Sequence, residues 1–169
     1  MNRPCDVEER DVTPAVRALR AAGVAFDLLE YAHDPSATSF GLEAASALGL
    51  DPGMVFKTLV ARLDGGQLVV ALIPADCELD SKRLAAACGA KSAAMATVAS
   101  AERATGYVAG GISPFGQRRP LPVIADASLA ARTRVSVSAG RRGLQVALGA
   151  ADLVRLCRAR LAPLARGPR

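Results

Sequence analysis

A lysine stands in the middle of an otherwise apolar stretch, Met54 to Val60, where its charge could do chemistry. Side chains alternate along a strand, so Lys57 is expected to share a face with Val55 and Leu59. Burying an ammonium is costly unless it is paired, and the chain uses 3 lysines against 18 arginines. A compact cation with several donors suits a site that holds an ester carbonyl or ribose oxygens. The alternative is an edge lysine that reaches water.

A glycine-rich segment, Gly106 to Gly116, is the second candidate, because paired glycines let the backbone approach a ligand closely. Gly110 and Gly111 are followed by Ser113 and Pro114, and the proline stiffens the turn after them. Exposed N–H groups in such a loop could bind an oxyanion or fix a carbonyl group. An ordinary tight connection between two elements is the alternative interpretation.

Two arginines, Arg141 and Arg142, occupy a predicted hairpin turn between Ser138 and Leu144. Their guanidinium groups could bind phosphates, and a solvated charged turn is the equally simple alternative. His33 is the only histidine, so a Ser–His–Asp or Cys–His–Asn triad would have to use it. Nucleophile-elbow, HEXXH, P-loop and GxGxxG patterns are all absent. A structural role is therefore favoured for the histidine.

The composition predicts one folded globular domain. The chain has 169 residues, of which 51% are hydrophobic and 4% aromatic, with no tryptophan. No apolar run approaches the roughly 20 residues that span a bilayer, and the polar N-terminus does not resemble a signal peptide, so we expect a cytoplasmic protein without membrane contact. The cysteines are far apart and form no CxxC pair, which argues against a zinc site or a disulfide scaffold: Cys5, Cys77, Cys88 and Cys157.

The net charge of +5 is distributed unevenly along the chain. Residues 1–110 carry 10 basic and 14 acidic side chains, a balance of −4, whereas residues 111–169 carry 11 basic and 2 acidic ones, a balance of +9. Such an excess predicts an electropositive face for a polyanion. A solvated arginine-rich surface is the alternative, and no compact block of like charges forms a basic tail.

Hydrophobic periodicity and turn residues predict a mixed α/β domain over residues 13–166, after a loose leader over residues 1–12. The irregular order of helices and strands is not that of a regular parallel Rossmann sheet. Helices are expected at 14–22, 41–48, 81–88, 99–104 and 150–161, and strands at 24–31, 55–63, 67–74, 123–126, 133–138 and 144–148. The last helix should present one apolar stripe formed by Leu153, Cys157 and Leu161.

In combination, these segments resemble the YbaK/EbsC family of aminoacyl-tRNA deacylases. The motifs stand in order and at family-like spacing: Thr13-Pro14-Ala15-Val16, Tyr31-x-His33-Asp34-Pro35, Phe40-Gly41, Val55-Phe56-Lys57-Thr58-Leu59, Leu79-Asp80-x-Lys82, Thr105-Gly106-Tyr107, Gly110-Gly111-Ile112-Ser113-Pro114-x-Gly116 and Arg142-Gly143-Leu144. The resemblance implies a mixed α/β fold with a central, partly barrel-like sheet surrounded by helices. It also implies trans-editing of mischarged tRNA, with proline tRNA carrying cysteine as substrate and prolyl-tRNA synthetase as a partner.

The resemblance further implies a reaction without metal, cofactor or protein nucleophile, in which the thiol of the substrate attacks its own ester. A second editing site is the physical remedy where two similar amino acids bind one synthetase pocket almost equally well. Lys57, Gly111 and Ser113 are then the expected catalytic contacts. The substrate-binding set is expected to include Tyr31, Phe40, Thr58, Gly110, Ile112, Pro114 and Gln145, and the tRNA-binding set Arg141 and Arg142.

One departure from the family pattern is Gln145, where close relatives often carry an aspartate. A glutamine can donate and accept hydrogen bonds but cannot act as a base. Three alternatives stay open: a deacylase for alanine or serine on tRNA, a non-catalytic tRNA- or synthetase-binding module, and a general thioesterase or amidase. The last is disfavoured because no nucleophile–base pair is recognisable.

Overall fold

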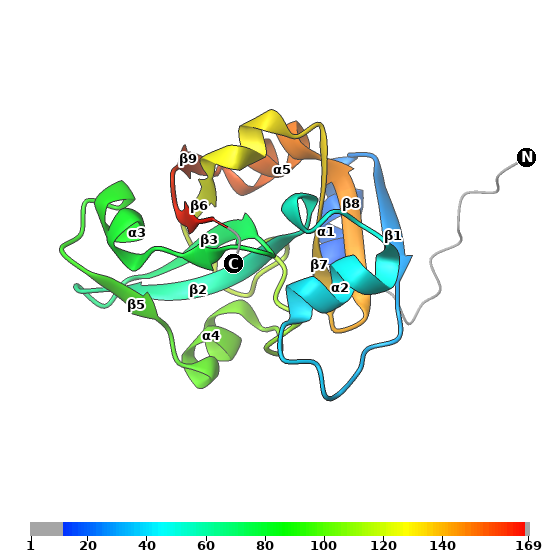
Figure 1. Cartoon of the computed structure of the whole chain (residues 1–169), viewed down its shortest axis with the longest axis horizontal. Coiled ribbons are helices and arrows are strands. Elements are labelled where there is room, and N and C mark those ends of the chain that lie inside the picture. The colour runs from blue at the N-terminus through cyan, green and yellow to red at the C-terminus, as the bar shows by residue number, and fades with distance from the viewer. Residues whose placement is uncertain (1–11, 168–169) are drawn as a thin grey trace, which may run out of the picture.

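The computed structural model describes residues 12–167, so all of the predicted leader except Val12 lies outside the described residues. A three-stranded antiparallel sheet and a five-stranded mixed sheet lie side by side, with helices around them (Figure 1). The first helix, α1 (Pro14–Ala22), forms as predicted: the Thr13 hydroxyl accepts a hydrogen bond from Val16 N at 3.1 Å, and Gly23 ends the helix at φ 69°. No helix within the described range is long and apolar enough to cross a membrane.

The larger sheet has five strands in the order β5-β2-β3-β6-β9. Its centre is the predicted hairpin of β2 (Phe56–Leu63) and β3 (Leu68–Pro74), and β6 (Val123–Asp126) joins β3 in parallel. The edges are formed by β5 (Ala93–Met95) and β9 (Arg160–Ala162). Seven consecutive buried residues make β3 a fully covered central strand.

The smaller sheet has three antiparallel strands in the order β1-β8-β7, with β1 (Phe26–Glu30) on one side of β8 (Leu144–Gly149) and β7 (Arg134–Arg141) on the other. A single parallel bridge, Val55 to Ser136, connects this sheet to the start of β2. The two sheets wrap around a shared core but remain open at their edges, and a short pair, β4 (Glu78–Leu79) with β10 (Ala165–Arg166), stands apart. The prediction of a mixed α/β fold is confirmed.

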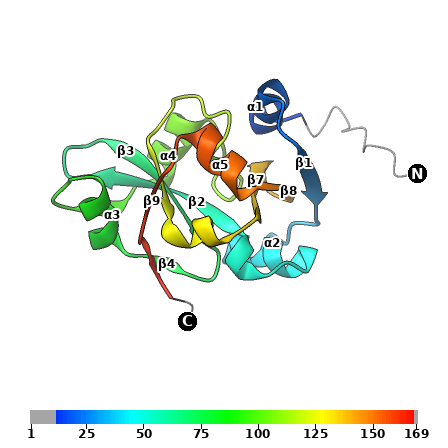
Figure 2. The ribbon, with the colours of Figure 1, turned by 90° about the horizontal axis from the view of Figure 1, so that it is seen from above.

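Four further helices cover the sheets: α2 (Phe40–Leu48), α3 (Ser81–Ala87), α4 (Val98–Thr105) and α5 (Ala150–Cys157). The main core lies between the two sheets, α1 and α5, and a second cluster lies between the larger sheet and α3. Two short 3-10 turns, Pro52–Met54 and Ala127–Ala131, precede β2 and follow β6. Seen from above, α5 lies near the middle of the molecule and α2 lies at one margin (Figure 2).

The prediction of a closing helix over 150–161 is wrong beyond residue 157. The helix α5 ends at Cys157, where Arg158 adopts a left-handed φ of 49°, and the chain continues as β9. Ile124 to Asp126 of β6 pair with β9 in parallel, so tertiary hydrogen bonding overrides the helical pattern. Leu161 therefore leaves the predicted stripe and is 42% exposed, whereas Leu153 is fully buried.

Candidate active site

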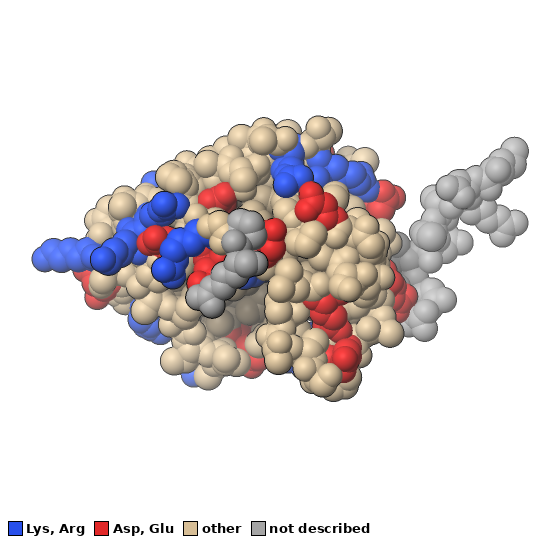
Figure 3. Space-filling view, in the orientation of Figure 1, with Lys and Arg blue, Asp and Glu red and all other residues tan. Residues whose placement is uncertain are grey.

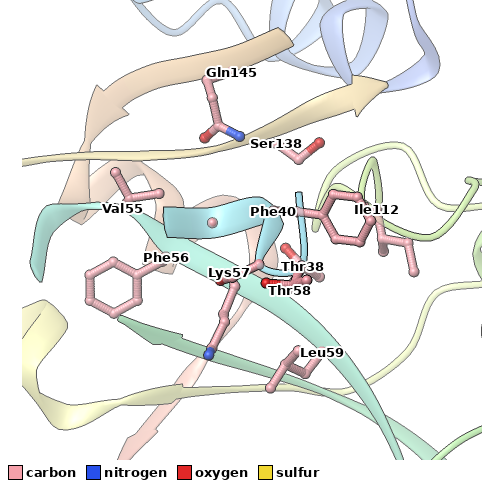
Figure 4. A pocket seen from close by; sticks show the side chains of 13 residues that line it. Thr38, Phe40, Val55, Phe56, Lys57, Thr58, Leu59, Ile112, Ser138 and Gln145 are labelled. Atoms are coloured by element: carbon pink, nitrogen blue, oxygen red, sulfur yellow. The ribbon is translucent and has the colours of Figure 1, made fainter. Parts of the chain in front are cut away.

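A cavity of about 240 Å³ opens where the N-terminus of α2, the first half of β2, the glycine-rich loop and the end of the smaller sheet meet (Figure 4). Six residues of the sequence-predicted site line it: Phe40, Lys57, Thr58, Gly110, Ile112 and Gln145. The remaining lining residues were not among the predicted site residues: Thr38, Ser39, Gly41, Val55, Phe56, Leu59 and Ser138. The structure thus brings together segments that are more than a hundred residues apart in the chain.

The wall formed by β2 has a free backbone edge. Val55 O accepts a hydrogen bond from Ala75 N at 2.7 Å, so odd-numbered residues of β2 exchange hydrogen bonds with β3. Even-numbered residues point the other way, as at Val60, whose carbonyl accepts from Ala96 N at 3.0 Å. Because β5 pairs only with residues 61–63 and the chain then turns into α4, the N–H and C=O of Thr58 face an edge with which no strand of residues 12–167 pairs.

The hydroxyl of Thr58 strengthens this wall as a binding surface. Its Oγ1 is buried, and it has no hydrogen-bond partner among residues 12–167. A buried hydroxyl without a partner costs about 1–3 kcal/mol, so such a group in a cavity wall indicates a site for a ligand. Because Thr58 also lines the cavity, a rotation of its side chain would bring the hydroxyl to a ligand there.

Lys57 lies on the opposite face of β2 from Thr58, as strand alternation requires. Its Nζ donates to Ala75 O at 3.5 Å, and the side chain points away from Gln145 in Figure 4. Burial lowers the pKa of the ammonium, and the neighbouring Cys77, Glu78 and Asp76 oppose that shift. The ammonium would have to swing from Ala75 to meet a substrate ester, a rotamer change that long side chains make rapidly.

Phe40 forms the opposite wall, and it is held by the turn that carries the two arginines. The Arg142 guanidinium carbon lies 5.2 Å from the Phe40 ring centroid, and Arg142 Nε donates to Ala109 O at 2.8 Å. Gly110 has φ 85°, and a Cβ at this position would come within 2.7 Å of the Phe40 ring. Arg142 thus connects α2 to the glycine-rich loop, and Arg141 pairs with Glu30 at 3.4 Å.

Gln145 closes the cavity from the smaller sheet, where it is 6% exposed. Its Oε1 accepts a hydrogen bond from Ser136 Oγ at 2.9 Å, so the amide nitrogen is the group that can donate a hydrogen bond to a ligand. Ser138 stands opposite Gln145 in the register of β7 and β8 and also lines the cavity. The alternation Val135-Ser136-Val137-Ser138 is the pattern in the sequence that would have indicated Ser138. The two valines are buried in the core, so the serines lie on the other face of the strand.

Four of the predicted site residues do not line the cavity: Tyr31, Gly111, Ser113 and Pro114. Ser113 is fully buried, and its hydroxyl accepts from Phe115 N at 3.3 Å. Pro114 is buried beside Cys157, and a Cβ on Gly111 would come within 2.8 Å of the Arg141 backbone. Tyr31 is half-buried, and burial raises the pKa of its hydroxyl. These positions support the loop and the turn, and their predicted contacts with substrate remain predictions.

His33 and the cysteines have structural surroundings. His33 Nδ1 lies 3.0 Å from a carboxylate oxygen of Glu43, and that carboxylate also accepts from Asp34 N at 2.6 Å. Burial raises the pKa of the Cys77 and Cys88 thiols and raises that of Cys157 to about 12; Cys5 lies outside the described residues. Within residues 12–167 no group of three or more His, Cys, Asp or Glu side chains is placed to hold a metal ion.

Comparison of the chain with known proteins identifies the class to which this fold belongs. Residues 33–156 match the family described as the aminoacyl-tRNA editing domain. A protein of Enterococcus faecalis assigned as a Cys-tRNA(Pro)/Cys-tRNA(Cys) deacylase, EbsC, is 34% identical over 152 residues, 90% of this chain and 92% of its own. The multifunctional Ser/Thr-tRNA deacylase ProXp-y of Escherichia coli is 33% identical over 124 residues, 70% of this chain and 74% of its own.

Solved structures agree. A structure assigned as a trans-editing enzyme for prolyl-tRNA synthetase superposes with a TM-score of 0.78 at 27% identity, covering 92% of this chain and 99% of the other. The chain belongs to the aminoacyl-tRNA editing domain family. It is an aminoacyl-tRNA deacylase, and the family resemblance inferred from the motifs is confirmed.

Proposed function

We propose that the chain hydrolyses Cys-tRNA(Pro) in trans and that the thiol of the substrate cysteine does the work of a protein nucleophile. The observation that supports this most directly concerns the hydroxyl groups of the cavity wall. Its hydroxyl groups belong to Thr38, Ser39, Thr58 and Ser138. Within residues 12–167 none of them hydrogen-bonds to a histidine or a carboxylate that could act as its base.

The three cysteine thiols within residues 12–167 do not supply a nucleophile either. Desolvation raises the pKa of Cys77, Cys88 and Cys157, so each is a thiol rather than a thiolate near neutral pH. An unperturbed cysteine thiol, with a pKa of about 8.5, has a useful thiolate fraction under the same conditions. A substrate that carries such a thiol beside an activated ester brings the more reactive group into the cavity.

In the proposed reaction the substrate sulfur attacks the ester carbonyl carbon and forms a C–S bond. The C–O bond to the terminal ribose then breaks, and the ribose oxygen takes up a proton as the tRNA leaves. Water opens the resulting cyclic thioester and restores free cysteine. The protein's task is to orient the aminoacyl group and to stabilise the oxyanion that forms during attack.

The groups available for that task lie on two sides of the cavity. Thr58 offers its unpaired N–H and its hydroxyl from the β2 edge, and Gln145 offers its amide nitrogen from the smaller sheet. Lys57 supplies the one ammonium of the lining set, which can rotate from Ala75 O toward the ester or ribose oxygens. Phe40 and Ile112 provide apolar surface for the terminal base or the aminoacyl side chain.

A second candidate substrate is serine or threonine on tRNA, because ProXp-y, a Ser/Thr-tRNA deacylase, is 33% identical to this chain. These side chains carry a hydroxyl instead of a thiol, so their removal needs a water activated by the enzyme. Gln145 cannot act as that base. The cysteine substrate is therefore favoured, and prolyl-tRNA synthetase is the proposed source of the mischarged tRNA.

The test is single-turnover deacylation of Cys-tRNA(Pro), Ser-tRNA and Ala-tRNA(Pro) by the wild type, Lys57→Ala and Lys57→Arg. We expect rapid cysteine release by the wild type, little release of serine or alanine, and a loss of about a hundredfold in Lys57→Ala. Substrate carrying S-methylcysteine, which is one methyl group larger and has no ionisable S–H, should resist hydrolysis. Rapid release of S-methylcysteine or serine would contradict the thiol-assisted mechanism.

A further inference from the structure

A second depression, of about 430 Å³, is lined by four arginines: Arg62, Arg103, Arg118 and Arg119. The other residues in its lining are neutral: Gly66, Leu68, Ser100 and Ala104. We call this depression the arginine groove. It is distinct from the candidate active site, with which it shares no lining residue.

The four side chains are brought together by the carboxyl end of α4. Arg118 N donates to Thr105 O at 2.9 Å and Arg119 N donates to Ala104 O at 3.1 Å, so both residues are fixed beside Arg103 in the last turn of the helix. Arg62 reaches the same place from β2, where it donates to Ser100 Oγ at 3.0 Å. The groove is therefore anchored by backbone hydrogen bonds rather than formed by loose surface side chains.

None of these four arginines forms a salt bridge with a carboxylate in the described part of the chain. Six of the other eleven arginines in that part of the chain do: Arg83, Arg132, Arg134, Arg141, Arg155 and Arg166. On the face drawn in Figure 3, basic and acidic side chains are accordingly intermingled. Four neighbouring cations without counter-charges repel one another, so an anionic ligand would relieve an existing cost.

The groove lies along the strand that forms the wall of the active-site cavity. Thr58 and Arg62 are four residues apart on the same face of β2, a distance of about 13 Å at 3.3 Å per residue. Ile112, which lines the cavity, packs in the same small cluster as Ala101 and Ala104 of α4 beneath the groove. A rigid ligand seated in the cavity could therefore extend into the groove without a change in the fold.

We propose that the arginine groove binds backbone phosphates of the RNA acceptor stem whose aminoacylated end enters the cavity. This inference rests on the proposed function, because it takes the substrate to be a tRNA. A guanidinium group binds phosphate oxygens with two parallel hydrogen bonds and stays charged at any physiological pH, which suits a fixed phosphate-binding groove. The contact is to the backbone, so it does not select one tRNA sequence over another.

The test compares Arg118→Glu/Arg119→Glu with a matched control, Arg132→Glu/Arg155→Glu, which changes the net charge equally. In Figure 1 the control residues belong to the end of the turn at 127–131 and to α5, on the far side of the sheets from α4. Binding of uncharged tRNA(Pro) is measured at several salt concentrations. We expect the groove variant to lose at least about tenfold in affinity and to reduce the slope of log K against log salt by about 2, with little change in the control.

Two further measurements keep failures distinguishable. Thermal unfolding of each variant, with Arg118→Gln/Arg119→Gln as a milder substitution, separates lost binding from lost folding. Equal affinities and equal salt slopes in the groove and control variants would overturn the groove while leaving deacylation by the wild type intact. Wild-type binding that depends on the groove, without cysteine release, would instead overturn the proposed substrate and support the groove.

Discussion

The Arg142 guanidinium stacks 5.2 Å from the ring centroid of Phe40, and its Nε donates to Ala109 O at 2.8 Å. One side chain thereby fixes a wall of the cavity and the start of the glycine-rich loop. This arrangement gives the arginine a role in shaping the site, in addition to the tRNA contact predicted from its charge. The two roles make different predictions.

Arg142→Ala should lower kcat/KM for the aminoacyl-tRNA by about tenfold, because loss of the cation–π contact and of a charged hydrogen bond is worth about 1.4 kcal/mol or more. Arg142→Lys keeps the charge but loses the planar stacking, so it should restore tRNA affinity and not the full rate. The salt dependence of tRNA binding is measured alongside. Equal rates in the wild type and Arg142→Ala would remove the shaping role.

Gly110→Ala should reduce activity, because the added methyl group meets a wall of the cavity. The residue has φ 85°, and the new Cβ would lie within 2.7 Å of the Phe40 ring, so the loop or the ring must move. Strain of this kind costs about 1–3 kcal/mol, which should appear in both kcat/KM and thermal stability. Gly65→Ala, where nothing lies within 4 Å, is the control and should change neither.

Gln145→Glu tests whether the neutral amide matters. The substitution preserves the side-chain length and the acceptor for Ser136 Oγ, but it places a carboxylate beside the site where an oxyanion forms. We expect kcat/KM to fall by about tenfold at neutral pH and to recover partly as the new carboxylate is protonated at lower pH. Gln145→Leu leaves Ser136 without its acceptor and should cost about 1–3 kcal/mol of stability. Increased activity of Gln145→Glu would indicate a base-assisted mechanism.

The sequence correctly predicted the elements that are bounded by helix-capping and turn residues. The helices predicted at 14–22 and 41–48 and the strands predicted at 55–63 and 67–74 formed within one residue of those bounds, because cap and turn residues act over a few bonds. The strands β5 and β9 were missed because each is only three residues long and is held by pairing with a distant strand. The same long-range pairing ended α5 at Cys157, four residues early.

The site was predictable in part for a similar reason. Lys57 and the glycine-rich loop carry unusual residue types, so the sequence marks them directly. The resemblance placed Thr58 in the substrate-binding set, but the position of its backbone groups, on the edge that β5 does not cover, depends on the register of β2. Gln145 was recognised by its departure from the family, but its hydrogen bond to Ser136 depends on two strands meeting.

The final prediction concerns pH and Tyr107, whose hydroxyl donates to Phe115 O and holds the far end of the glycine-rich loop. Burial raises the pKa of Tyr107 from 10.0 to about 12, which means that the fold favours the neutral phenol. The resulting stabilisation is complete below pH 10 and is lost as the pH rises from 10 toward 12. Tyr107→Phe should therefore be less stable than the wild type by about 1 kcal/mol at neutral pH, and the difference should shrink above pH 10. Denaturant unfolding across this pH range measures the stability difference, and tyrosinate absorbance is an independent readout. A stability difference that stays constant with pH, or a wild-type titration in which both tyrosines ionise near pH 10, would contradict a buried Tyr107 hydroxyl that donates to Phe115 O.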